Sequence, residues 1–206
     1  MGRASSNKKV ARAARAAGRQ SSSRSSLAWP LAMAAVVALG AVLIFVSRGG
    51  ERAAADPPVL GDHWHAAVGI YVCGDFQPNP NDAKQDASGI HSHGDGLMHI
   101  HPFGTRYTGD GANVAAFADT VGMEITDERL VLPGGQALAN GDDCGGEPGV
   151  VQVKVWGSNA EQTGFLLDGD FGDYAPSDGS LVTIAFAPEG ADIPKPPSAG
   201  TTPADV

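Results

Sequence analysis

The chain has 206 residues, enough for one ordinary domain with appendages, and a formal net charge of -9 at pH 7. The charge is divided unevenly along the chain. The segment before Ser47 contains seven Lys and Arg residues and no acidic residue. From Arg48 onward, seven Lys and Arg stand against all 23 Asp and Glu. An acidic surface repels nucleic acid and attracts cations, so the composition excludes a nucleic-acid-binding role for this larger part of the chain.

The first 50 residues of the sequence predict a single-pass membrane topology. Residues 1–26 form a basic tail that we expect to be disordered and cytoplasmic. Residues 27–47 are apolar and uncharged, and at 1.5 Å per residue they would span roughly 30 Å, the thickness of a bilayer core. The excess of Lys and Arg before this run places the N-terminus inside and the following domain outside the cell membrane. The predicted partner of residues 27–47 is therefore the lipid bilayer.

A cleavable signal peptide is the alternative interpretation of this segment. Ala53-Ala54-Ala55 offers the small residues that a signal peptidase needs. The apolar run is longer than a usual signal core, and Arg48 and Glu51 separate it from the alanines, which favours an uncleaved span. The basic tail has an alternative interpretation too, as a nucleic-acid-binding arm, but a topology signal is favoured.

The remainder divides into a stalk at 48–58, an extracytoplasmic domain at 59–187 and a Pro-, Ala- and Thr-rich tail at 188–206 that we expect to be disordered. Cys73 and Cys144 are the only cysteines. In an exported domain two such thiols are expected to form a disulfide, and a metal-ligand role is the alternative for this pair. Closing a loop of about 70 residues would stabilise the fold by roughly 2–4 kcal/mol.

Strand patterns dominate the domain. From Trp64 to Val72 every second residue is apolar, which predicts a strand with one core face and one chemically different face. Similar strands are expected at 150–156 and 181–186. A short helix is expected to be capped by Asp110 and to end at Gly122. The predicted fold is α+β and mostly β, an antiparallel sheet with one short helix, preceded by a single transmembrane helix.

The histidines are the clearest chemical signal. All six occur in three His-x-His pairs, which contain His63, His65, His91, His93, His99 and His101. In a strand, residues two apart point the same way, so each pair presents two imidazoles on one face. Several neutral nitrogen donors in one place suit a transition metal, with Zn²⁺ as the first expectation and Cu²⁺ as the alternative.

Two of the pairs are close enough in sequence to form one hairpin. A three-residue loop at Gly94-Asp95-Gly96 would place His91 opposite His99 and bring all four histidines to one side of the ribbon. Ile90 and Ile100 would then point to the other side, toward the core. An even-length loop would instead bury two histidines among apolar groups, so the pattern favours the odd loop.

Neighbouring polar residues complete the predicted site. Asp62 and Asp95 are expected to act as ligands or as acceptors that fix the imidazole tautomers. Tyr71 shares the histidine face of its strand and is a candidate hydrogen-bond donor. The acidic run from Asp168 to Asp173 is a weaker signal for Ca²⁺, because it lacks the twelve-residue EF-hand spacing and its closing Glu, and a solvated turn is favoured.

These patterns predict a non-catalytic, membrane-anchored, extracytoplasmic domain that binds a transition metal as a sensor, buffer or delivery module. The first alternative is a zinc-dependent extracytoplasmic hydrolase, in which three histidines hold the ion and Asp62 or Asp95 is the general base. It ranks second because no Glu lies beside the histidine pairs. The other alternative is a structural or interaction domain in which the histidines only pack. The sequence indicates no particular protein partner.

Three strings carry a family resemblance: Asp62 to Cys73, Gly89 to Phe103 and Ile193 to Ser198. With them the chain resembles an uncharacterised family of single-pass, His-rich exported membrane proteins of high-GC Gram-positive bacteria. The resemblance covers most of the outer domain. It implies a location and a grouping, and no activity. The His-x-His motif is also used by cupins, but the Glu and the later His that follow it in that family are absent here.

Overall fold

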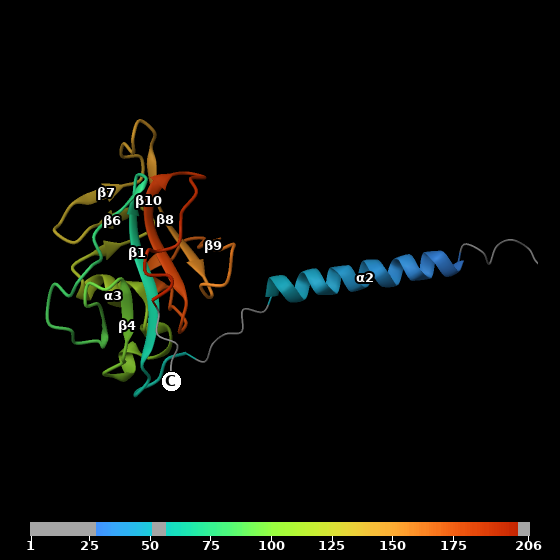
Figure 1. The fold of residues 1–206 in the computed structure, drawn as a ribbon, viewed down its shortest axis with the longest axis horizontal. Helices are drawn as coiled ribbons and strands as arrows, with labels where there is room; N and C mark the ends of the chain where they lie inside the picture. The colour runs from blue at the N-terminus through green and yellow to red at the C-terminus, as the bar shows by residue number, and fades with distance from the viewer. Residues whose placement is uncertain (1–27, 51–56, 202–206) are drawn as a thin grey trace, which may run out of the picture. The chain divides into compact units, whose positions relative to one another are not determined.

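A computed structural model describes residues 28–50 and 57–201 (Figure 1). The chain divides into two compact units, one ending at Ala53 and the other beginning at Ala54. The predicted basic tail at 1–26, part of the predicted stalk and the last five residues lie outside the described residues.

The first unit contains one described helix, α2 (Ala28–Gly50), over the stretch where a transmembrane helix was predicted. Its described side chains include exposed apolar groups such as Trp29 and Val37. Within the described residues, however, no helix combines the length and the apolar character that crossing a membrane requires. The predicted membrane span at 27–47 is therefore not confirmed. Residue 27 and the side chains of residues 28 and 41–47 lie outside the described part.

The second unit is built on a large sheet. Its described strands are β1 (Trp64–Val72), β2 (Asp75–Phe76), β3 (Ile90–His91), β4 (Leu97–Ile100), β8 (Gly149–Trp156), β9 (Phe165–Leu166) and β10 (Leu181–Pro188). They run in the order β3-β4-β1-β10-β8-β9, and β2 pairs with β1. The strands predicted at 64–72, 150–156 and 181–186 are confirmed as β1, β8 and β10.

The predicted antiparallel sheet is wrong at one place, because β1 and β10 run parallel. Figure 1 shows these two strands side by side, with β4 and β8 on their outer sides. A parallel pair needs a long crossover connection, and here nearly the whole domain lies between its two strands. The strand pattern of the sequence carries no information about this direction, so the sheet is mixed where an antiparallel one was expected.

A smaller antiparallel sheet consists of β5 (Glu124–Ile125), β6 (Arg129–Val131) and β7 (Ala137–Ala139). The described 3₁₀ turns are η1 (Thr105–Tyr107), η2 (Gly109–Gly111) and η3 (Phe171–Asp173). Within the described part of this unit, α3 (Val114–Thr120) is the one α-helix, which confirms the expected short helix.

The helix begins later than expected. Asn113, whose side chain accepts a hydrogen bond of 3.0 Å from the backbone N–H of Ala116, is the cap instead of Asp110. Asp110 lies in the preceding turn η2. Asn and Asp cap helices about equally well, so residue preference alone could not choose between them. Gly122, with φ +73°, lies just past the end of the helix, as predicted.

The main core lies on one face of β1. Ala66, Val68 and Ile70 are buried in the same cluster as Phe117 of α3 and Ile184 of β10. The alternation predicted along β1 is therefore confirmed, and the odd-numbered positions face the other way. On that second face, a smaller buried cluster contains Ala67, Leu97, Trp156 and Leu181.

The predicted disulfide is confirmed between Cys73 and Cys144, which are separated by 71 positions. It ties the end of β1 to the loop between β7 and β8. A cross-link that closes a loop of this length stabilises a fold by about 4 kcal/mol on the loop-entropy account. The metal-ligand alternative for this cysteine pair is excluded, since both sulfurs are consumed.

The C-terminal segment (residues 189–201) is packed, although the sequence predicted a disordered tail from 188. Ile193 is 1% exposed. The hydroxyl of Thr183 donates to the carbonyl of Pro194 at 2.8 Å, and the hydroxyl of Ser198 donates to the carbonyl of Gly96 at 2.6 Å. Pro-rich backbone has few N–H groups of its own to satisfy, so it can cover a sheet face through its carbonyls.

Candidate metal centre

Three adjacent strands place histidines directly opposite one another. His91 of β3 pairs with His99 of β4, and His99 pairs with His65 of β1. The predicted hairpin register is therefore confirmed, with Ile90 paired to Ile100 on the core side. The result is a row of three imidazoles that crosses three strands on one face of the sheet.

The other three histidines lie two residues along the chain from this row and join it. The ring centroids of His63 and His101 are 4.2 Å apart, those of His93 and His99 are 4.5 Å apart, and those of His63 and His65 are 4.7 Å apart. We call the whole group the histidine cluster; it consists of His63, His65, His91, His93, His99 and His101. The predicted convergence of all six side chains is confirmed.

Two groups, one inside the cluster and one that combines Asp95 with two of its histidines, have the spacing of metal ligands. His63, His65 and His99 form one, and His93, Asp95 and His99 form the other; within each, the ligand atoms all lie within 4.8 Å of one another. Nε2 of His63 is 3.1 Å from Nε2 of His65, and in the metal-free protein the two atoms share a hydrogen bond. Two ligand atoms on one tetrahedral Zn²⁺ are roughly 3.3 Å apart, given bonds of about 2.0–2.1 Å. The first pair therefore already has the spacing that zinc requires.

Burial and mutual repulsion keep the imidazole rings of His99 and His101 neutral. Burial lowers the pKa of His101 to about 4, helped by the nearby imidazoles of His63 and His91. Burial also lowers the pKa of His99, and His93 adds to the effect, although the Asp95 carboxylate opposes it. Both rings are therefore uncharged at neutral pH, the form that binds metals. Nε2 of His101 is buried and has no hydrogen-bond partner within residues 57–201.

The carboxylate of Asp95 lies beside the ring of His99 in the histidine cluster. Its Oδ2 atom is 2.9 Å from Nε2 of His99, and its Oδ1 atom accepts a hydrogen bond of 3.0 Å from the backbone N–H of Leu97. Burial alone would raise the pKa of Asp95, but the hydrogen bonds from His99 and Leu97 outweigh it and the net pKa is lowered. The ionised carboxylate accepts, so in the metal-free protein Nε2 of His99 carries the proton, which an ion bound between Asp95 and this nitrogen would displace.

Asp86 is a second carboxylate at the cluster, and it was not among the predicted residues. Its Oδ2 atom is 3.0 Å from Nδ1 of His91, although the two groups are not aligned for a hydrogen bond. Its carboxylate also accepts from the backbone N–H groups of Ser88 and Gly89. Burial alone would raise the pKa of Asp86, but these bonds lower it. The signal in the sequence is an Asp two residues before a Ser, typical of an Asx turn.

The side chains of Asp62 and Tyr71 contact residues outside the histidine cluster. The carboxylate of Asp62 accepts a hydrogen bond of 2.8 Å from the backbone N–H of Val59 and closes a turn. The ring of Tyr71 packs edge-on against Phe76, with centroids 5.2 Å apart. The carboxylate that contacts His65 belongs to Asp178. It accepts a hydrogen bond of 2.9 Å from the backbone N–H of His65. These contacts do not support the roles predicted for Asp62 and Tyr71.

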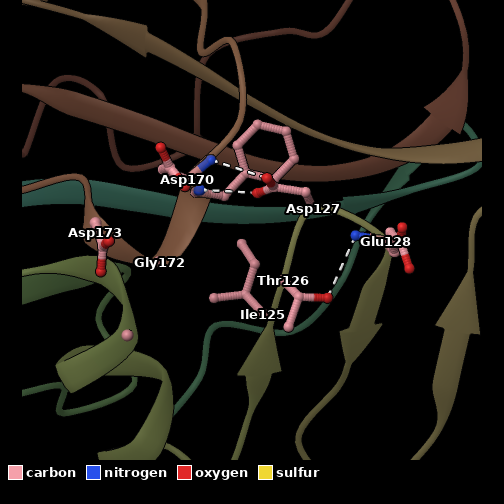
Figure 2. A pocket seen from close by; sticks show the side chains of 9 residues that line it. Ile125, Thr126, Asp127, Glu128, Asp170, Gly172 and Asp173 are labelled. Carbon is pink, nitrogen blue, oxygen red and sulfur yellow. Dashed lines mark hydrogen bonds between the residues drawn. The ribbon is translucent and has the colours of Figure 1, made fainter.

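Residues 170–173 of the acidic run from Asp168 to Asp173 line part of an open depression of about 600 Å³ (Figure 2). Asp127 points into this loop, and its carboxylate accepts hydrogen bonds from the backbone N–H groups of Asp170 and Phe171 at 3.0 and 3.1 Å. Asp170 and Asp173 are themselves exposed. Within the described residues no three carboxylates of this loop converge as ligands.

Comparison of the chain with family models, with curated proteins and with solved structures found no match. The class of site is therefore defined by its geometry. Three imidazoles held in register on three paired strands, with three further imidazoles and two carboxylates beside them, form a candidate transition-metal centre. The resemblance to a family of exported membrane proteins stays a prediction.

The pKa of His101 makes stability depend on pH in the metal-free protein. We expect the free energy of unfolding to fall as the pH drops from 6.5, the ordinary histidine value, to about 4, because the unfolded chain then binds a proton that the folded protein excludes. Urea unfolding at several pH values measures this. In His101→Gln the decline over that interval should be shallower, and an unchanged decline would contradict the assignment.

Proposed function

We propose that this domain binds a transition metal ion, Zn²⁺ first and Cu²⁺ as the alternative, and serves as a non-catalytic sensor, buffer or delivery module. One observation carries the proposal. His63 and His65 hold their Nε2 atoms 3.1 Å apart, and His99, from a different strand, completes a three-ligand group with them. Sequence-distant imidazoles meet at a spacing that suits one ion.

The state of the ring nitrogens supports this proposal. A buried polar atom without a partner costs roughly 1–3 kcal/mol, so folded proteins rarely keep one without a reason. Nε2 of His101 is such an atom within the described residues. The lowered pKa of His101 keeps the ring neutral at neutral pH, so one of its two ring nitrogens has a lone pair for an ion.

The donor set supports Zn²⁺ or Cu²⁺ over softer and harder ions. Imidazole nitrogens suit both, whereas Cu⁺ prefers thiolate and thioether sulfur. Both cysteines are joined in the disulfide, so no thiolate is on offer. Ca²⁺ and Mg²⁺ prefer sets made of oxygen atoms, and the cluster supplies few of them.

The disulfide also supports the proposed location. Such bonds persist in oxidising compartments and are rare in a reducing cytoplasm, so we place the domain outside the cytoplasm. Attachment to the membrane through residues 27–47 is a separate proposal that rests on the apolar run and on the basic residues before it. Partition of the full-length chain between membrane and aqueous fractions tests that part.

A zinc-dependent hydrolase is the second candidate. A group of three histidines leaves a fourth position on the ion for water, as catalytic zinc sites do. We rank it second because the nearby carboxylates are engaged. Asp95 accepts from Leu97 and faces His99, and Asp86 accepts from Ser88 and Gly89, so in the metal-free protein both carboxylates are held in place by neighbouring N–H groups.

Equilibrium dialysis of the purified full-length protein tests the metal-binding proposal. At neutral pH and micromolar free metal, we expect the protein to retain Zn²⁺ and Cu²⁺, measured by elemental analysis of the dialysed protein. Ca²⁺ is the matched control and should not be retained by the histidine cluster. Failure to retain either transition metal would contradict the proposal and leave the structural or interaction domain as the remaining interpretation.

A further inference from the structure

The two ligand groups of the histidine cluster overlap in one residue. His63 and His65 share His99 with a second pair, His93 and Asp95, and in each group the three ligand atoms lie within 4.8 Å of one another. His99 occupies the middle strand of the three, with ring contacts to His65 on one side and to His93 on the other. The ring of His99 therefore belongs to both ligand sets, and one set lies on each side of it.

The two sets differ in accessibility and in donor type. In the first set only His63 is exposed, His65 and His99 are buried, and all three donors are imidazoles. In the second set His93 and Asp95 are both exposed, and one donor is a carboxylate. An ion that arrives from solvent therefore meets the second set at the surface, with a negative charge that attracts it.

The loop that carries Asp95 is fastened at several points. The hydroxyl of Ser198, which is 6% exposed, donates to the carbonyl of Gly96 at 2.6 Å. The side chain of Asn79 donates to the carbonyl of Gly94 at 3.3 Å. Asp95 itself accepts from the backbone N–H of Leu97 and faces His99. These bonds hold the carboxylate beside the ring, so its position is built into the fold.

We propose that Asp95 is a metal ligand and that His93, Asp95 and His99 form a second, outer position for the same ion, which enters there and passes to the inner position at His63, His65 and His99. This inference rests on the proposed function. Because both positions need His99, one ion occupies the cluster at a time. Two divalent ions on either side of one imidazole would repel each other strongly, with a single carboxylate in the two sets to offset them.

Co²⁺ is the probe for this inference, since its absorption reports binding to nitrogen ligands. The full-length protein and three variants, His63→Gln, His93→Gln and Asp95→Asn, are mixed with Co²⁺ and followed by stopped-flow absorbance and by titration. We expect His63→Gln to lower the equilibrium affinity about 10-fold or more, and His93→Gln and Asp95→Asn to slow capture about 10-fold while changing the affinity much less. Asp62→Asn is the matched carboxylate control, because Asp62 contacts the backbone of Val59, and it should change neither quantity.

Three outcomes would overturn the inference and leave the proposed function intact. They are equal losses of affinity in His63→Gln and Asp95→Asn, an unchanged rate of capture in both outer-set variants, and two Co²⁺ ions bound per chain. Absence of Co²⁺ binding by the unaltered protein is a different result. It would remove the proposed function and, with it, this inference.

Discussion

Replacement of His99 by Gln is expected to lower the affinity for Zn²⁺ by about 100-fold or more, since loss of a residue that only supports a ligand already costs 10–100-fold. His99 belongs to both ligand groups. Its ring also contacts those of His65 and His91 on the two flanking strands. Gln is neutral and polar but cannot place an imidazole nitrogen at the same point, so both positions lose a donor together.

Competition with a chromophoric chelator measures this effect, and thermal unfolding of the metal-free protein checks the fold. His99 is 8% exposed, so a change there can disturb packing. His63→Gln is the second variant, because His63 is exposed and its replacement should leave the metal-free fold intact. Its affinity should also fall, by about 10-fold or more. Affinities close to that of the unaltered protein in both variants would show that the cluster does not hold the ion.

Replacement of Gly89 by Ala is expected to destabilise the fold by roughly 3–5 kcal/mol, from backbone strain and from overpacking together. Gly89 has φ +83°, which disfavours any side chain with a Cβ atom. A Cβ atom there would also overlap the carbonyl oxygen of His101, whose N–H group donates to the carbonyl of Gly89 at 2.7 Å. The hairpin would have to open at the point where His91 and His101 approach each other.

Gly94→Ala is the matched control for this prediction. Gly94 has φ +76°, and a Cβ atom added there would come no closer than 3.9 Å to its nearest neighbours, the side-chain atoms of Asn81. It therefore carries the strain of the backbone without the overlap, and we expect a loss of only about 1 kcal/mol. Urea unfolding measures both values. Equal losses in the two variants would mean that the approach of Gly89 to His101 does not matter for stability.

Local patterns in the sequence were enough to predict most of the histidine cluster. The alternation from Trp64 to Val72 fixes which residues of β1 face the core, because side chains in a strand alternate with a period of two. The odd loop at Gly94-Asp95-Gly96 fixes the register of His91 against His99, because a shift by one residue would exchange the two faces. The pairing of Cys73 with Cys144 needed no pattern beyond their number.

Features that depend on distant parts of the chain were missed. Nothing in the residues of β10 reveals that it runs parallel to β1, because a buried strand has the same apolar pattern in either direction. The prolines after Pro188 were interpreted as signs of disorder, yet Ile193 and Ser198 pack on the sheet. Asp86 was overlooked because its role depends on where the turn before β3 places its carboxylate.

The parallel pairing of β1 with β10 has a consequence for how the protein is made. Ala67 finds its partner Leu181 only when almost all of the domain has left the ribosome, and such long-range closures fold slowly. Until then, the strand that carries His65 has one open edge and an uncovered face. The sheet that supports the row of His65, His91 and His99 is therefore completed only late in synthesis.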